Sequence, residues 1–402
     1  MRRLFLYGPS MYKQAMPDTL DPANAIPQNA FLNDTAMRLG IQVLSGTPLT
    51  RDQARELTQL EGNDLYDLFF WANKIRTQFV GANAKFCSIV TGKVGGCSED
   101  CSYCSQSKHY DTHVEPSRMR VEEMQSAADE ALASGASSFG IVNSGRGPTD
   151  KELDWMEPFF RKAAEGGEIR PCATLGELTG DQAKRLADMG VQRINHNLET
   201  SKRHFGNVVS THSYEDRVKT IRTAKEAGLS ICSGGIFGLG EDWEDRLDMA
   251  FELKELGADV VPINFLNAIQ GTPLHGKREA LEPMQALKIV AIYRFILPDR
   301  ELKIAGGRET ILRDLQSWMF FAGGSSFLIG NYLTTFGRTP KQDHQMLADL
   351  GMKIHLFNEV EVEAEPEAAP GAGAGALGIG AEANSLMVRK RGSVVALPVI
   401  DG

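Results

Sequence analysis

Short apolar segments alternate with amphipathic segments from Lys85 to about residue 355. The apolar segments have strand length, and the segments between them repeat apolar residues at three- and four-residue spacing. Eight strands, each followed by a helix, predict a (β/α)8 barrel of the TIM type, which typically needs about 250 residues. A doubly wound open sheet is the alternative. The expected strands are 85–91, 137–143, 170–175, 191–195, 230–236, 259–265, 302–305 and 325–329, and the expected helices include 121–133, 181–189, 214–227, 243–256, 283–296 and 308–321.

The segments on either side of this repeat differ in composition. Residues 1–45 show little periodicity before about residue 31, and two helices are expected from Thr50 and over 63–80. Residues 358–402 pass from alternating glutamates into an Ala-Gly-Pro stretch that cannot bury enough apolar surface to order itself. We therefore expect an N-terminal extension over 1–45, a barrel domain over 46–357 and a flexible tail over 358–402, with a short strand within 387–400.

The charge balance points to small-molecule ligands. The net charge of −9 over 402 residues argues against nucleic acid or an anionic membrane surface as the main partner. The first residues lack the apolar run of a signal peptide, and no stretch reaches the roughly 18–20 apolar residues of a membrane span. We expect a cytoplasmic protein, in which six cysteines are better suited to metal binding or catalysis than to disulfides.

Three of these cysteines form a C-x3-C-x2-C motif in one short loop, Cys97, Cys101 and Cys104. Three thiolates can hold a four-iron cluster while leaving one iron without a protein ligand. An open metal position is typical of catalytic sites, whereas structural zinc sites use four protein ligands. A zinc knuckle completed by a distant histidine and a ferredoxin-like carrier are the alternatives, but neither usually has this spacing.

The other three cysteines fall on expected odd-numbered strands. Cys87 lies on the first, Cys172 on the third and Cys232 on the fifth, with Arg308 at the end of the seventh. Alternate strands fill one layer inside a (β/α)8 barrel. If the strand count holds, these four residues meet in one layer and can bind a second iron–sulfur cluster. Taken singly, each cysteine is more simply a small buried hydrophobe.

The first motif, with the aromatic Tyr103 before its last cysteine, resembles the radical S-adenosylmethionine (SAM) superfamily. In that superfamily SAM chelates the open iron, and an electron from the cluster cleaves SAM to a 5'-deoxyadenosyl radical. Further motifs, in order along the chain, resemble the biotin synthase family. They are Thr91–Ser107, Asn143–Pro148, Asn195–Ser201, Cys232–Glu241, Val261–Asn264, Gly271–Leu274 and Gly306–Glu309.

This resemblance implies an auxiliary cluster that donates sulfur and is held by three cysteines and an arginine. Cys172, Cys232 and Arg308 match that set by position, but Gly140 stands where the family has its remaining cysteine. Cys87 stands where serine is common. We therefore expect a ligand swap from Gly140 to Cys87, with an auxiliary cluster of either the 2Fe–2S or a four-iron type.

The resemblance also assigns residues around SAM and substrate. Glu199 replaces the usual aspartate and would accept bonds from the SAM ribose, and Arg217 would lie near SAM, although a solvated helix arginine is its ordinary role. Asn197 and Asn264 would bond the ureido ring of dethiobiotin, against the simpler reading of turn residues. His196 is interpreted as an orienting or packed residue.

The activity implied is insertion of sulfur into dethiobiotin to form biotin, with the catalytic residues Cys97, Cys101, Cys104 and Arg308. An electron donor such as flavodoxin or ferredoxin, and a homodimer, belong to the same expectation. Two rivals remain open. A radical SAM enzyme resembling the hydrogenase maturases would act on another substrate, and a non-enzymatic iron–sulfur scaffold would need no SAM pocket.

Overall fold

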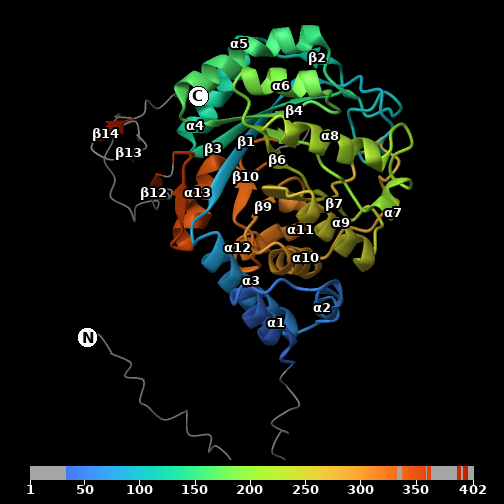
Figure 1. The fold of residues 1–402 in the computed structure, drawn as a ribbon, viewed down its shortest axis with the longest axis vertical. Coiled ribbons are helices and arrows are strands. Elements are labelled where there is room, and N and C mark those ends of the chain that lie inside the picture. Colours follow the sequence, from blue (N-terminus) through green and yellow to red (C-terminus); the bar gives the residue numbers. More distant parts are fainter. Residues whose placement is uncertain (1–32, 333–336, 359, 364–386, 391–392, 397–402) are drawn as a thin grey trace, which may run out of the picture.

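The core of the molecule is a closed barrel of parallel strands (Figure 1). The computed structural model describes residues 33–332, 337–358, 360–363, 387–390 and 393–396. The last barrel strand pairs in parallel with the first, Cys87 opposite Leu328, so the sheet has no free edge and the open-sheet alternative is wrong. In barrel order the strands are β1 (Lys85–Val94), β3 (Ala136–Asn143), β4 (Arg170–Thr174), β5 (Arg193–Asn195), β6 (Ser230–Cys232), β8 (Val260–Phe265), β9 (Glu301–Ile304) and β10 (Ser326–Leu328).

Two short strands extend this barrel. β2 (Ser117–Arg118) pairs antiparallel with the end of β1, and β7 (Gly235–Phe237) pairs with β8. The expected strand 230–236 is thus two strands, β6 and β7. They are separated at Gly234, where the backbone lies very close to Pro262. A Cβ on Gly234 would lie 2.0 Å from the Pro262 carbonyl oxygen, so only glycine fits there.

Helices surround the barrel, and most begin at a side-chain cap. Thr149, Thr179, Ser213, Asp242 and Thr339 each form a capping box that satisfies free N–H groups of the first turn. Their apolar faces pack on the strands. The helices are α4 (Val121–Ala133), α5 (Asp150–Gly166), α6 (Gly180–Asp188), α7 (Lys202–Phe205), α8 (Tyr214–Glu226), α9 (Trp243–Glu255), α10 (Pro283–Ile296), α11 (Arg308–Leu312), α12 (Trp318–Phe321) and α13 (Pro340–Asp349).

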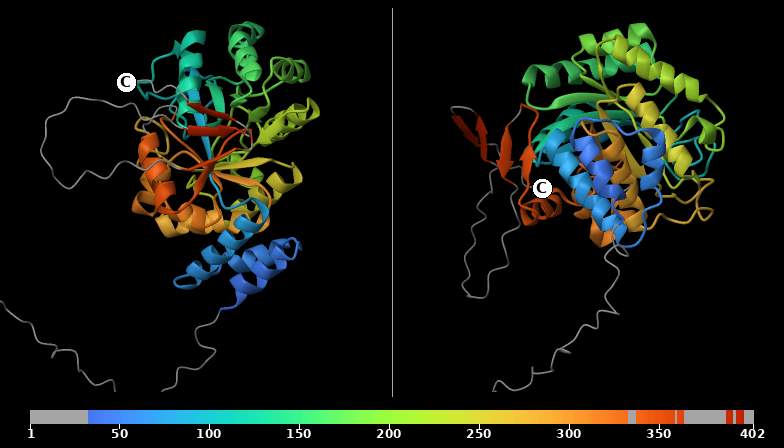
Figure 2. Two further views of the ribbon diagram at one scale, coloured as in Figure 1. Left: turned by 90° about the vertical axis from the view of Figure 1, so that its left-hand side faces the viewer. Right: turned by 60° about the horizontal axis from the view of Figure 1, so that its bottom comes forward.

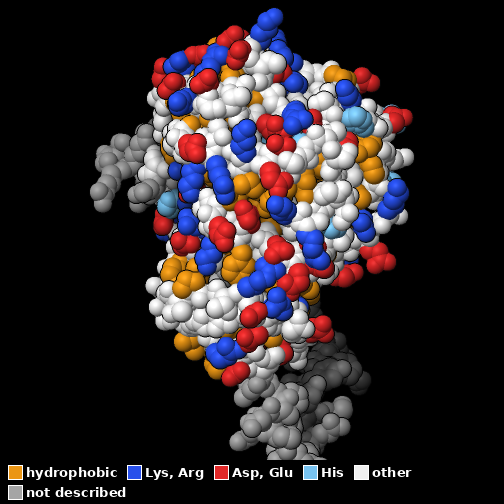
Figure 3. All heavy atoms as spheres, turned by 45° about the vertical axis from the view of Figure 1, so that its right-hand side comes forward, with side chains coloured by type: hydrophobic (Ala, Val, Ile, Leu, Met, Phe, Trp, Pro, Cys, Tyr) orange, Lys and Arg blue, Asp and Glu red, His pale blue; other side chains and the backbone are white. Residues whose placement is uncertain are grey.

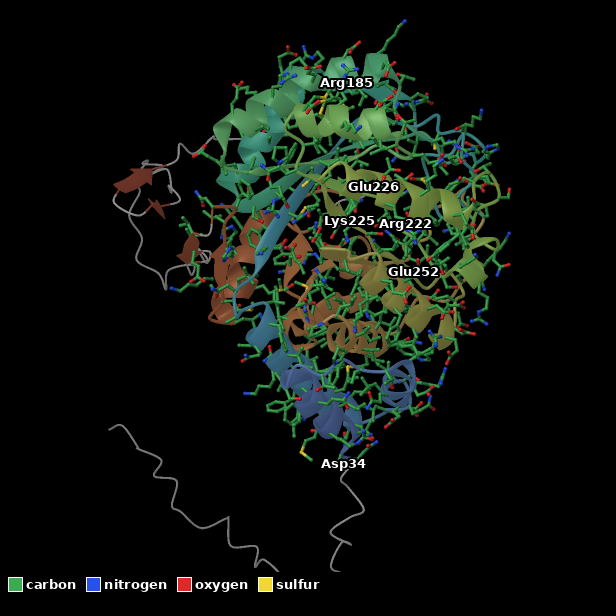
Figure 4. The ribbon with its side chains drawn as sticks, in the orientation of Figure 1. Asp34, Arg185, Arg222, Lys225, Glu226 and Glu252 are labelled. Carbon is green, nitrogen blue, oxygen red and sulfur yellow. The ribbon has the colours of Figure 1, made fainter. Side chains whose placement is uncertain are left out.

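Neighbouring helices of this outer ring are also joined to one another. Arg185 of α6 pairs with Glu157 of α5 at 3.2 Å, and the Lys225 ammonium of α8 donates to the Leu256 carbonyl, which ends α9, at 3.0 Å. Figure 4 labels Arg185, Lys225 and, on α9, Glu252. These contacts join α5 to α6 and α8 to α9 around the barrel.

The expected helix 308–321 is interrupted. It consists of α11, the 3-10 turn Arg313–Leu315 and α12. Arg313 has a positive φ of 50°, a conformation that costs energy for a residue other than glycine and cannot continue a right-handed helix. Apolar periodicity continues across the break, which is why the sequence predicts one helix.

Three helices precede the barrel and lie on its outside (Figures 1 and 2). They are α1 (Thr35–Leu44), α2 (Arg51–Leu57) and α3 (Asp64–Phe79). α3 packs on α1, α10 and α12, and α2 packs on α9. Glu244 accepts from both Arg51 and Arg55, which joins α2 to the start of α9. The helix expected from Thr50 is present as α2, and the helix expected over 63–80 is present as α3. α1 lies inside the expected extension 1–45, of which residues 1–32 lie outside the described residues.

The described C-terminal residues form two antiparallel strand pairs. β11 (Lys353–His355) pairs with β12 (Glu361–Glu363), and β13 (Met387–Lys390) pairs with β14 (Ser393–Ala396). β12 lies at the start of the expected tail 358–402, where no strand was expected, whereas β13 and β14 lie in the stretch 387–400 where a short strand was expected. Most of that tail lies outside the described residues. Among the described residues no helix is long and apolar enough to cross a membrane. Figure 3 shows acidic and basic side chains interspersed over one face of the molecule.

Candidate active site

A cavity of about 440 Å³ lies inside the barrel and opens toward the carboxyl ends of the strands. Both cysteine sets line it, together with Tyr103, Asn197, Glu199, Arg217 and Asn264. The carboxyl end is where (β/α)8 enzymes place their catalytic residues, because the loops that follow the strands converge there. Two groups of thiols that are separate in the sequence therefore face one cavity.

The C-x3-C-x2-C loop follows β1 directly. Gly95 and Gly96 have φ of 68° and 62°, which turns the chain out of the strand at positions where glycine carries no steric penalty. The backbone then closes on itself, since the Cys97 amide donates to the Gln106 carbonyl at 3.0 Å and the Gln106 side chain accepts from Gly95 at 3.1 Å. The three thiols are thereby held on one short, internally bonded loop.

Acidic side chains within the motif attach this loop to the segment before α8. Asp100 accepts from the backbone amides of Ser210 at 2.9 Å and Thr211 at 3.1 Å. Burial raises the pKa of Asp100, but the bonds from the Ser210 and Thr211 hydroxyls together with those from the two amides outweigh it and lower the pKa to about 2. Glu99 accepts from His212 at 2.7 Å with both side chains buried. The loop is thus positioned relative to the segment that leads to Arg217.

The thiols of the loop lie at the cavity wall. Among the described residues, no group of three Cys, His, Asp or Glu side chains is arranged to hold a single metal ion. Burial raises the pKa of Cys101 to about 12 and of Cys104 to about 11, with Arg217 opposing the shift at Cys101. Iron must therefore displace protons as it binds.

Beside the thiols lies a buried charged pair. Glu199 and Arg217 approach to 3.6 Å, and Glu199 has a positive φ of 70°, unusual for a residue with a side chain. Its backbone is held there because it exchanges bonds with Gly234 and Ile236. Burial raises the pKa of Glu199, and it lowers the pKa of His196 well below its usual range with Arg217 acting in the same direction.

Several polar atoms of this region are buried without a hydrogen-bond partner among the described residues. They include Glu199 Oε2, Arg217 Nε and His196 Nε2. Buried polar atoms normally have a hydrogen-bond partner. Three unpartnered atoms in one region therefore indicate that a bound polar ligand supplies the missing partners. SAM carries hydroxyl, amino, carboxylate and sulfonium groups, and an acceptor, a donor and a neutral imidazole beside the cysteine loop suit it.

The two asparagines lie at the cavity wall. Asn197 Oδ1 accepts from the Gly234 amide at 3.2 Å, and Asn264 bridges two loops by donating to the Gly235 carbonyl at 3.1 Å and accepting from the Gly306 amide at 2.9 Å. Both side chains are therefore fixed in orientation at the ends of β5 and β8.

The second cysteine set occupies alternate strands of the closed barrel. Cys87 is on β1, Cys172 on β4 and Cys232 on β6, which are the first, third and fifth barrel strands. All three side chains are buried and free of disulfides. The layer expected from the sequence is present, and its fourth position on the seventh barrel strand, β9, is filled by Lys303. The Lys303 ammonium lies 3.3 Å from Cys87 Sγ and 3.8 Å from Cys232 Sγ.

Arg308 does not belong to this layer, so that part of the prediction is wrong. Its side chain is 0% exposed and outside the cavity lining, and it donates to Asp343 and to Gln316, both at 2.7 Å. It also lies over the Phe327 ring at 5.0 Å. The reason is that β9 ends at Ile304, and Arg308 begins α11, where it packs between α13 and β10.

Gly140 and Cys87 occupy different levels of the barrel. Gly140 pairs with Ile89 on one side and Cys172 on the other, whereas Cys87 pairs with Ser138. The thiol of Cys87 therefore enters two residues nearer the amino ends of the strands. A Cβ on Gly140 would lie 3.3 Å from Ile89 Cγ2 and 3.6 Å from Cys172 Cβ, a tight fit rather than an empty space.

The sequence interpretation missed the charges around the second cysteine set. Lys303, Arg193 and Glu301 are side chains of β5 and β9 that the strand pattern did not single out. Burial lowers the pKa of Lys303, but the charges of Cys232, Cys87 and Glu301 outweigh it and raise the pKa above its ordinary value. The sequence does contain an indication of this buried charge. Lys303 stands between apolar residues of a buried strand, where lysine is rare unless it has a partner.

Comparison with known proteins defines the class and then the family. A model of the Radical SAM superfamily matches residues 93–253, and a model of the Biotin and Thiamin Synthesis associated domain matches residues 262–353. The cysteine loop, the cavity and these matches define a radical SAM enzyme, which uses SAM with a 4Fe–4S cluster. Biotin synthase from Geobacter sulfurreducens is 47% identical over 80% of this chain and 98% of its own length, and that from Carboxydothermus hydrogenoformans is 44% identical over 78% and 97%. The chain belongs to the biotin synthase family.

Solved structures share the barrel at low sequence identity. Methylornithine synthase superposes with a TM-score of 0.67 at 20% identity, covering 78% of this chain and 96% of that one. The FeFe-hydrogenase maturase HydG from Carboxydothermus hydrogenoformans gives 0.66 at 20% identity, covering 80% of each chain. At this identity the likeness concerns the fold alone, so the maturase-like rival gains no support from it.

Proposed function

We propose that this protein forms biotin by inserting sulfur into dethiobiotin, with two iron–sulfur clusters in one barrel. The observation that carries the proposal is that both cysteine sets line one cavity in a chain of the biotin synthase family. When bound, the four-iron cluster and SAM supply hydrogen-abstracting radical chemistry, and the auxiliary cluster supplies sulfur. Two C–H bonds of dethiobiotin are exchanged for two C–S bonds, and each hydrogen atom leaves on one deoxyadenosine.

The residues of this chain bind and orient. Cys97, Cys101 and Cys104 hold the four-iron cluster, and Tyr103, Glu199 and Arg217 line the adjoining SAM site. Asn197 and Asn264, fixed by the loops that they bridge, orient the ureido ring of the substrate, for which an amide offers both a donor and an acceptor. The barrel wall keeps water away from reactive intermediates.

For the auxiliary cluster we propose Cys87, Cys172 and Cys232 as the ligands. Gly140 cannot bind iron, and Cys87 is the remaining cysteine that faces the cavity. Because Cys87 enters at a lower level than Gly140, the three thiolates have a geometry different from that expected of the usual 2Fe–2S site. This supports a four-iron auxiliary cluster.

The remaining expectations concern the cellular setting. We propose a cytoplasmic homodimer that is reduced by a flavodoxin or a ferredoxin. Six large apolar side chains are exposed among the described residues, and five of them lie on the adjoining helices α1, α3 and α12. These five form the surface that we assign to the dimer contact: Met37, Ile41, Tyr66, Phe70 and Phe321.

An anaerobic single-turnover assay tests the function. Reconstituted wild type and Cys87→Ala would be mixed with SAM, dithionite and dethiobiotin, and deoxyadenosine and biotin measured by mass spectrometry. We expect deoxyadenosine from both proteins but biotin from wild type only, because the first cysteine set is intact in the variant.

Two results would count against this assignment. Deoxyadenosine without biotin from wild type would leave the radical chemistry standing but contradict the substrate or the auxiliary cluster. Biotin from Cys87→Ala at the wild-type yield would contradict the ligand swap.

A further inference from the structure

Lys303 places an ammonium inside the barrel, among the proposed auxiliary-cluster ligands. Its neighbours along β9, Leu302 and Ile304, are fully buried, and Lys303 itself is 6% exposed. Its Nζ lies 3.3 Å from Cys87 Sγ and 3.8 Å from Cys232 Sγ. These sulfurs come from the first and fifth barrel strands and Lys303 from the seventh, so the contact depends on the closed barrel.

This ammonium has no carboxylate within 4.0 Å among the described residues. Glu301, the nearest acidic residue along the strand, contacts Lys85 at 3.7 Å and acts on Lys303 and Arg193 only at longer range. A second buried cation adds to the excess of positive charge, since Arg193 is 5% exposed and pairs with Cys172 along the β4–β5 ladder. A buried ammonium without an ion-pair partner is unfavourable, because burial removes its hydration. The site is therefore built for an anionic, sulfur-bearing group.

The position of Lys303 suits hydrogen bonding rather than iron ligation. A charged ammonium has three N–H donors and no lone pair for a metal. Two sulfurs already lie within reach of its nitrogen, and a third donor remains for a sulfur atom of the bound group. Hydrogen bonds to the sulfurs of a cluster are among the factors that set its reduction potential.

We propose that Lys303 is a positioning residue that donates hydrogen bonds to the sulfur atoms of the auxiliary cluster, raises its reduction potential and does not bind iron. This inference rests on the proposed function, because it requires an auxiliary cluster held by Cys87, Cys172 and Cys232. Its consequence for sulfur insertion is that the cluster accepts an electron more readily as it gives up sulfide.

The experiment compares Lys303→Met, which removes the charge at similar length, with Lys303→Arg, which keeps it. Lys85→Met is the matched control, since it removes a cation from the other side of Glu301 at a partly exposed position away from the cysteines. Each reconstituted full-length protein is examined for iron and sulfide content, Mössbauer spectrum and the midpoint potential of the auxiliary cluster. Wild type labelled with 15N-lysine is examined by pulsed EPR in the reduced state.

We expect Lys303→Met to shift the auxiliary midpoint potential to a lower value, with Lys303→Arg closer to wild type and Lys85→Met unchanged. Loss of the auxiliary cluster from Lys303→Met alone would also support a required cation. Wild-type potentials in both Lys303 variants would overturn the proposal. So would loss of the cluster from both, or a strong 15N coupling that shows iron-bound lysine.

Failure of the two proposals can be told apart. A wild-type protein with the four-iron cluster alone, and no second component in its Mössbauer spectrum, would overturn the auxiliary cluster and the role of Lys303 together. A wild-type protein with both clusters whose auxiliary potential ignores Lys303 would overturn the role of the lysine only.

Discussion

At the scale of single residues, the geometry of the three barrel thiols depends on the level at which each one enters the barrel, and not only on its presence. Cys87 and Gly140 lie on adjacent strands, but Cys87 pairs with Ser138 and enters two residues lower. The register of β1 against β3 shifts between Phe86 and Cys87, and this irregularity sets both the face and the depth of the thiol. The presence of three cysteines in the layer therefore does not by itself define the geometry of a cluster.

The ligand swap predicts a rescue. Cys87→Ala should lose the iron of the auxiliary cluster, and adding Gly140→Cys should restore a third thiolate and part of that iron. The new Cβ must displace Ile89 slightly, at a cost of about 1–3 kcal/mol for overpacking. Iron content and Mössbauer spectra measure the outcome, with Gly140→Cys alone as control. Full auxiliary iron in Cys87→Ala would refute the swap.

At the scale of elements, the cysteine loop depends on a loop far away in the sequence. Asp100 joins it to residues 210 and 211, just ahead of α8, which carries Arg217. The same connection continues through Glu99 and His212. The cysteine loop and the segment that leads into α8 are thus joined by side-chain hydrogen bonds.

We predict that Asp100→Ala lowers stability by about 1–3 kcal/mol, because it removes charge-assisted bonds to two backbone amides. The pKa of Asp100 is lowered to about 2, so the stabilisation is present above the ordinary carboxyl pKa and is lost as the pH falls toward 2. Thermal unfolding of the apoprotein between pH 7 and pH 3 checks this. The difference between wild type and variant should shrink on acidification, and a constant difference would contradict the assignment.

The bounds of the helices show which elements can be predicted from sequence patterns alone. α4 and α10 have the residue ranges that their apolar spacing predicts. The stretch 308–321 breaks into three pieces because Arg313 takes a positive φ, which no periodicity reveals. The long helix α5 contains Pro158 in its interior, a position where proline ordinarily interrupts a helix.

At the scale of the whole molecule, α1 and α3 cover one side of the barrel and leave apolar side chains exposed on their outer faces. We predict that the double variant Ile41→Glu, Phe70→Glu elutes as a monomer while wild type elutes as a dimer, because two buried charges would oppose the contact. Size-exclusion chromatography with light scattering measures the mass. A monomeric wild type would contradict the dimer, and a dimeric variant would place the contact elsewhere.

The sequence by itself determined the barrel and the first cysteine set, because both depend on local information. Apolar periodicity marks each strand and helix, and one short loop holds Cys97, Cys101 and Cys104. It also placed Cys87, Cys172 and Cys232 on alternate strands. Only the tertiary structure decided what completes that layer. Lys303 and Arg308 are five residues apart, but one lies on β9 facing the cysteines and the other begins α11 and pairs with Asp343. That choice follows from where β9 ends and how the closed barrel aligns its strands, and side chains from distant segments meet only after closure.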